Sequence, residues 1–111
     1  MENSDKNVEG IFKSGVNYLE NGQLKDAIDA FEEVIAVDDN DTAAHFNLGL
    51  ACMRMVRKDV DREELYEDKT DEESWILRAI SEFNKVLELE PENKEAKDNI
   101  KALNELLDIG I

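Results

Sequence analysis

The chain offers one thiol and one imidazole for chemistry, Cys52 and His45. A catalytic thiol needs a neighbouring base to take its proton. These two residues are 7 positions apart, which on one helix is about two turns and beyond hydrogen-bond reach. Cys52 stands between Ala51 and Met53, where a thiol packs as a small hydrophobe. A single cysteine also excludes an internal disulfide.

Acidic residues are plentiful but do not form a metal motif. Residues 59–73 hold nine acids and two bases, a net charge of −7. A calcium loop starting at Asp59 needs glycine at its sixth position and glutamate at its twelfth, and those positions are Glu64 and Thr70. Zinc lacks the cysteine and histidine ligands it usually requires. No nucleophile–base pair or phosphate loop stands out, so we predict no enzyme, no metal site and no cofactor.

The charge balance narrows the class of partner. The sequence has 13 lysines and arginines against 28 acids, a formal charge of −15. Such a surface repels phosphates, so nucleic acid and anionic lipid are poor partners. No apolar run approaches the ~20 residues of a bilayer span, and the first residues lack the basic and apolar regions of a signal peptide. We expect a cytoplasmic location, although a soluble domain of a membrane-anchored protein would look the same.

Helical periodicity dominates the sequence. Apolar residues recur at helical spacing in five segments. Ser4, a capping box at Thr70 and Asn93 are the expected N-caps, and the acidic run at 38–41 suits the start of the next helix, where the dipole favours negative charge. Asn21-Gly22 and Pro91 mark two ends. The expected helices span about 4–20, 24–37, 42 onward, 71–90 and 94–108.

A repeat of 34 residues underlies these helices. Gly15 and Gly49 are one period apart, and each is followed by an Ala-x3-Phe pattern, at Ala27 and at Ala79. The chain thereby resembles the tetratricopeptide repeat family, whose pattern is W-x2-L-G-x2-Y, then A-x3-F, then P. Tyr18 and Pro91 also match, whereas Ile11, Ser14 and Asp39 replace the tryptophan, leucine and proline of the first repeat.

The resemblance implies an all-α fold in which antiparallel helix hairpins stack as a short right-handed α-solenoid. We expect a single domain over 1–111, with a first repeat at about 8–41, a second at about 42–93 and a capping helix at about 94–108. The second repeat departs from the pattern by an 18-residue insertion near 55–73. Because helical spacing continues past Met53, we expect a long helical hairpin with its turn near 67–70.

In the family, the first helices of successive repeats line a concave groove that binds peptides or partner helices. The corresponding residues here are mostly apolar: Phe12, Val16, Leu19, Phe46, Asn47, Leu50, Met53, Ala102 and Leu106. Some members hold the C-terminal carboxylate of heat-shock chaperones with lysine, arginine and asparagine at five positions. These positions are Phe12, Val16, Asn47, Glu95 and Asn99 here, and only the asparagine at 47 matches. We therefore do not expect binding of that type, because a carboxylate needs cationic donors.

We expect a protein–protein interaction module that binds an apolar or amphipathic segment in this groove. Two alternatives stay open: a homo-oligomerisation domain of a larger, membrane-anchored or soluble protein, and an acidic, chaperone-like binder of basic proteins. A homodimer would bury the same groove or the apolar C-terminal end at Leu106, Ile109 and Ile111. A second contact surface could form around the insertion, with Leu65, Tyr66 and Trp75 as anchors.

Overall fold

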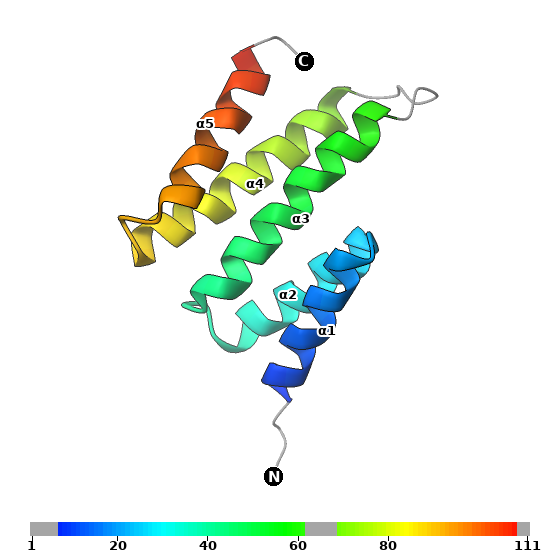
Figure 1. Cartoon of the computed structure of the whole chain (residues 1–111), viewed down its shortest axis with the longest axis vertical. Coiled ribbons are helices and arrows are strands. Elements are labelled where there is room, and N and C mark those ends of the chain that lie inside the picture. Colours follow the sequence, from blue (N-terminus) through cyan, green and yellow to red (C-terminus); the bar gives the residue numbers. More distant parts are fainter. Residues whose placement is uncertain (1–6, 62–68, 109–111) are drawn as a thin grey trace.

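The computed structural model describes residues 7–61 and 69–108, which contain five α-helices and no strand. The helices are α1 (Val8–Glu20), α2 (Leu24–Val37), α3 (Thr42–Asp61), α4 (Lys69–Leu89) and α5 (Lys94–Asp108). Each helix packs against the next, and α3 lies between α1 and α5 in Figure 1. The expected all-α architecture of stacked helical hairpins is confirmed.

Side-chain caps start three of the helices. Asn7, Asp41 and Asn93 each accept a hydrogen bond from the backbone N–H three residues later, at 3.1, 3.0 and 2.9 Å. This satisfies one of the free donors at a helix start. The cap at Asn93 was predicted, whereas the acidic run at 38–41 was expected at the start of α3 for its charge and not as a side-chain cap. The expected cap at Ser4 is wrong because α1 begins at Val8 after Asn7.

Glycine ends the first helix as predicted. Gly22 has a φ of +78°, a left-handed conformation that glycine adopts without steric cost. The N–H of Gln23 then donates to the carbonyl of Tyr18 at 2.8 Å. The carbonyl of Leu19 accepts from the N–H of Gly22 at 3.1 Å and also from the guanidinium of Arg54 on α3 at 3.2 Å, so α3 is tied to the end of α1.

The 34-residue repeat has a direct structural meaning. A Cβ added at Gly15 would lie 2.8 Å from the ring of Phe31, and one added at Gly49 would lie 2.8 Å from the ring of Phe83. Both rings are fully buried. The glycines therefore let the second helix of each hairpin place a phenylalanine directly against the backbone of the first.

A second aromatic contact repeats with the same geometry. Phe12 meets Phe31 edge to face with ring centroids 5.5 Å apart, and Phe46 meets Phe83 at 5.4 Å, both at an interplanar angle of 66°. Such T-shaped pairs are a preferred arrangement of aromatic rings. The two hairpins thus share one packing scheme although their helices are connected by segments of different length.

The insertion lengthens both helices of the second hairpin. α3 continues to Asp61 and α4 begins at Lys69, as the continued helical spacing predicted. The expected turn at 67–70 is wrong in its second half, because Lys69 and Thr70 are already helical, and Thr70 is therefore not an N-cap. Residues 62–68, which connect the two helices, lie outside the described part of the chain.

Candidate functional site

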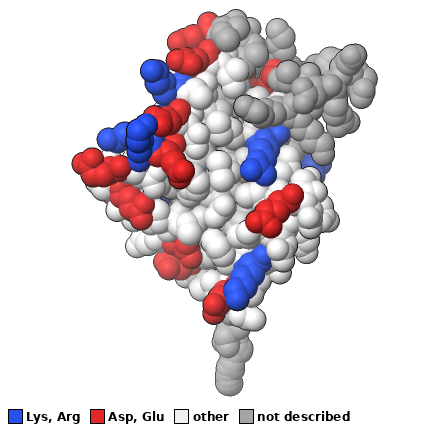
Figure 2. All heavy atoms as spheres, viewed as in Figure 1, with Lys and Arg blue, Asp and Glu red and all other residues white. Residues whose placement is uncertain are grey.

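Five of the apolar side chains predicted to line a groove are half-buried in the structure. Phe12 and Val16 on α1 and Phe46, Leu50 and Met53 on α3 all pack against the core and keep part of their surface in solvent. In Figure 2, uncharged residues fill the middle of the face shown, and charged residues lie mostly toward its edges.

Two of the predicted groove residues have other roles. Leu19 is only 5% exposed and belongs to the core, so its side chain is not available to a partner. Asn47 is half-buried and donates its side-chain amide to the carbonyl of Ala43 at 2.9 Å, one turn earlier on the same helix. This bond leaves the side-chain carbonyl of Asn47 as an acceptor.

α5 contributes an exposed edge to the same side. Ala102 and Leu106 are exposed, and Leu106 is one of the large apolar residues in contact with solvent. The opposite side of α5 is buried through Ala96 and Leu103, which are 0% exposed. Ala102 lies about 100° and Leu106 about 60° around the helix axis from Leu103, and both side chains are exposed to solvent.

A hollow lies between α3 and α5. It has a volume of about 330 Å³ and is lined by Phe46, Leu50, Glu95, Asp98 and Asn99. The phenylalanine and leucine come from α3, and the three polar residues come from the first turns of α5. The sequence predicted the α3 residues of this hollow, and it identified Glu95 and Asn99 only as positions that do not fit a carboxylate site.

Of the two acids at the hollow, Asp98 has an ion-pair partner among the described residues and Glu95 has none. Lys94 donates to Asp98 at 2.8 Å, and this hydrogen bond raises the pKa of Lys94. Glu95 is exposed and has no ion pair with any residue in the described ranges. Asp98 was not singled out from the sequence, although it stands three residues after Glu95 and therefore on the same side of the helix.

The second predicted surface is described only in part. Trp75 is half-buried and packs against the core, whereas Leu65 and Tyr66 lie outside the described residues. The apolar C-terminal residues Ile109 and Ile111 also lie outside them. An arrangement of these residues as contact surfaces remains a prediction from the sequence.

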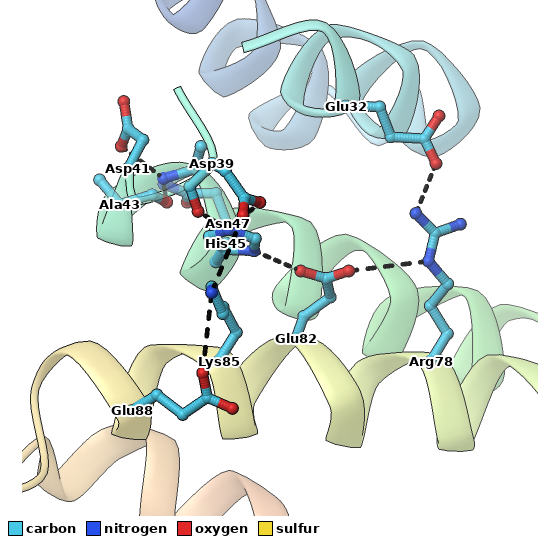
Figure 3. A network of polar contacts seen from close by, with 11 residues as sticks. Glu32, Asp39, Asp41, Ala43, His45, Asn47, Arg78, Glu82, Lys85 and Glu88 are labelled. Carbon is cyan, nitrogen blue, oxygen red and sulfur yellow. Dashed lines mark hydrogen bonds and ion pairs between the residues drawn. The ribbon is translucent and has the colours of Figure 1, made fainter. Parts of the chain in front are cut away.

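A polar network connects α2, α3 and α4, and sequence reasoning missed it (Figure 3). His45 is 5% exposed. Its Nδ1 lies 2.7 Å from the carboxylate of Glu82, and its Nε2 lies 2.8 Å from the backbone carbonyl of Asp39. The two contacts join the ring to α4 on one side and to the backbone before α3 on the other. The network therefore anchors the loop before α3 to the middle of α4.

Arg78 extends the network to α2. Its guanidinium donates to Glu32 at 2.5 Å and lies 3.9 Å from Glu82. Burial alone would lower the pKa of Arg78, but the hydrogen bond to Glu32 and the surrounding charges outweigh it and raise the pKa. A sequence signal existed for His45, because it is a polar residue one period after the apolar Ile11. No comparable signal marks Arg78 or Glu82.

Cys52 is a structural residue. It is 0% exposed, and burial, with a smaller opposing effect of Arg78, raises its pKa from 9.0 to about 12. The reactive species of a cysteine is the thiolate. Burial and the raised pKa therefore make the Cys52 thiol a poor nucleophile in the folded protein.

We expect the Cys52 thiol to resist a disulfide reagent at about pH 8 in the folded protein and to react fully after denaturation. Because the folded pKa is raised, the thiol stabilises the fold below pH 9 and this contribution is lost as the pH rises toward 12. Spectrophotometric titration of the thiol in the native and the denatured protein checks both points. Rapid stoichiometric reaction of the native protein would contradict them.

The described residues hold no group of three or more histidine, cysteine, aspartate or glutamate side chains that could bind a metal ion. None of their helices is both long and apolar enough to cross a membrane.

Comparison with known proteins supports the repeat. Residues 15–56 match the family model described as TPR repeat. Two solved structures are similar over 91% of this chain at 21% identity, each with a TM-score of 0.42. One is the first TPR of Spaghetti (RPAP3) bound to the HSP90 peptide SRMEEVD, of which 93% is covered, and the other is the first TPR domain of human RPAP3, of which 92% is covered. Curated protein sequences give no match.

Proposed function

We propose that the chain is a member of the tetratricopeptide repeat family, whose model matches residues 15–56, and that its groove binds an apolar or amphipathic segment of another protein. The observation that carries the proposal is the hollow between α3 and α5, where Phe46 and Leu50 stand open to solvent beside α5. Leu106, farther along α5, continues the apolar surface. Isolated exposed leucines are common, but several apolar groups around one concavity are typical of a binding site.

The energetics of such a groove suit a modest affinity. Fully burying one large apolar side chain contributes about 1.5–3 kcal/mol. A partner segment that covers the half-exposed residues of α3 and α5 recovers only part of this at each residue, and it also loses conformational freedom on binding. A micromolar complex, at about 8 kcal/mol, then needs several such contacts together. An amphipathic helix with apolar residues at i, i+3, i+4 and i+7 supplies them on one face.

The RPAP3 domain holds an HSP90 peptide with two adjacent glutamates near its C-terminus. We propose that this chain does not take such acidic peptides. The hollow carries Glu95 and Asp98. Among the described residues, Lys94 pairs with Asp98, and no cation pairs with Glu95. An acidic segment would bring further negative charge to a site that has no fixed fork of cationic donors.

We expect a leucine-rich amphipathic helical peptide to bind the wild-type chain, and we expect Leu50→Glu together with Leu106→Glu to lower its affinity about a hundredfold. The reason is the loss of two apolar contacts and the burial of two unpaired carboxylates against apolar surface. Fluorescence anisotropy of a labelled peptide measures the change.

The matched control is Leu77→Glu with Val37→Glu. These side chains are 55% and 56% exposed, and they lie on α4 and α2 rather than in the groove. Equal losses in both double variants would refute the groove as the binding site. Circular dichroism of each variant separates lost binding from lost fold.

A second copy of the chain is the alternative occupant. Light scattering over a concentration series decides it, since a dimer that dissociates in the Leu50→Glu, Leu106→Glu variant would mean that the groove is filled by self-association. A monomer in both proteins leaves the groove open to a different partner.

A further inference from the structure

The hollow between α3 and α5 combines an apolar floor with an acidic wall. From this combination we infer that, within the proposed groove-binding function, the preferred occupant is a segment that carries a lysine or arginine next to an apolar side chain. The apolar side chain would pack on Phe46 and Leu50, and the basic group would lie beside Glu95 and Asp98. The inference rests on the proposed function and adds the charge of the partner.

The geometry of α5 makes the wall acidic. Glu95, Asp98 and Asn99 all face the hollow. Asp98 is three residues and Asn99 four residues after Glu95, so all three share one side of the helix. The lysines at 97 and 101 are two and six residues after Glu95, which places them roughly 200° and 240° around the helix axis. These two lysines therefore point away and leave the negative charge of the wall in place.

One lysine stands at the edge of the hollow without neutralising it. Lys94 pairs with Asp98 at 2.8 Å, but its side chain is 83% exposed and that of Asp98 is 61% exposed. An ion pair this exposed is weak and exchanges readily with another cation. Glu95 has no ion-pair partner in the part of the chain that the structure describes, so it is available to a cation from the partner.

The floor favours the same kind of segment. The stems of lysine and arginine are apolar and cover hydrophobic surface while the charged head stays in solvent. Here the stem would extend over Leu50 toward the first turn of α5, where the carboxylates stand. Asn99 is half-buried and lines the same hollow as the two carboxylates. Its side-chain amide can donate or accept a further hydrogen bond.

The net charge of −15 gives a rival explanation, in which any basic molecule is attracted to the whole surface. The two explanations differ in where the charges must be. Long-range attraction depends on the sum of charges and is screened beyond about 8 Å at physiological salt, whereas the hollow depends on Glu95 and Asp98. Changing a pair of exposed acids on another helix therefore distinguishes the two explanations.

The test uses two labelled helical peptides with identical leucine positions and a free C-terminal carboxylate, one with lysines and the other with glutamates at the flanking sites. The wild-type chain should bind the lysine peptide at least about tenfold more tightly. In Glu95→Lys, Asp98→Lys this preference should reverse. In Asp26→Lys, Asp29→Lys, which makes the same change in net charge on exposed positions of α2, the preference should stay within about threefold of wild type.

A milder pair guards against loss of fold. Glu95→Gln, Asp98→Asn keeps the shape of the wall and should reduce the preference for lysine to about threefold or less. Equal effects of the α5 and α2 variants would overturn the inference in favour of general acidity. Equal affinity of both peptides for wild type would overturn it and leave the groove function standing, whereas binding of neither peptide would overturn both.

Discussion

Replacing Gly49 with leucine is expected to abolish folding at room temperature. The Cβ of any side chain at this position would lie 2.8 Å from Cε1 and Cζ of Phe83, closer than carbon atoms pack. Phe83 is 0% exposed, and its ring also contacts that of Phe46, which lies one turn before Gly49 on α3, with ring centroids 5.4 Å apart. Because the ring is fully buried, we expect the leucine to fit only if α3 and α4 separate. Overpacking a well-packed core usually costs about 1–3 kcal/mol, and a full leucine against a fixed ring exceeds this range.

Circular dichroism during thermal unfolding measures the effect. Gly49→Ala should lower the free energy of unfolding by about 1–3 kcal/mol, since only one methyl must be accommodated. Ala43→Leu is the matched control, because residue 43 is exposed on the same helix and leucine is a good helix former. Cooperative unfolding of Gly49→Leu at the wild-type midpoint would show that the ring moves aside.

The equivalent pair in the first repeat allows a sharper version. A Cβ at Gly15 would also lie 2.8 Å from a ring, that of Phe31, so Gly15→Ala should cost a similar free energy. Gly49→Ala combined with Phe83→Leu should be less destabilised than the sum of the two single variants, because the smaller side chain makes room for the methyl. Additive effects would mean that the glycine acts through helix propensity alone.

These contacts explain why the fold could be predicted so far from the sequence. In each hairpin, the glycine of the first helix meets the phenylalanine of the Ala-x3-Phe pattern in the second helix. This same contact occurs twice, one 34-residue period apart in the first helices. A long insertion did not hide the pattern, since it lengthens α3 and α4 at their far ends and leaves their packed halves unchanged. The errors fall at helix ends, where Asn7 rather than Ser4 is the cap, because short polar side chains at neighbouring positions are interchangeable as caps.

The candidate site was less accessible to sequence reasoning. The apolar α3 residues of the hollow follow from their repeat positions, but the role of Asp98 depends on how α5 is rotated against α4. Burial also could not be assigned from type alone, since Leu19 belongs to the core while Leu106 is exposed. The contacts of Glu82 and Arg78 join residues 37 and 46 positions apart, and charged residues on a helix give no sign of such partners.

Removing the imidazole of His45 is expected to cost about 2–4 kcal/mol of stability. His45→Ala loses contacts at 2.7 and 2.8 Å and leaves the carboxylate of Glu82, which is 15% exposed, without its buried partner. A buried polar group that loses its partner suffers its full desolvation penalty. Arg78 compensates only in part, because its Nε lies 3.9 Å from Glu82 while its Nη2 binds Glu32.

The repeat itself supplies the matched rescue for this loss. One period before His45 stands Ile11, so the same position in the first hairpin is filled by an apolar side chain. His45→Ile with Glu82→Leu removes both partners and should recover most of the stability that His45→Ala loses, since replacing both members of a buried polar pair is often neutral. Urea unfolding of the single and double variants gives the coupling free energy. If the double variant were as unstable as the sum of its single changes, pairing with Glu82 would not explain the cost of losing the imidazole. The hydrogen bond between His45 and the backbone carbonyl of Asp39 would then be the contact that holds α3 in place.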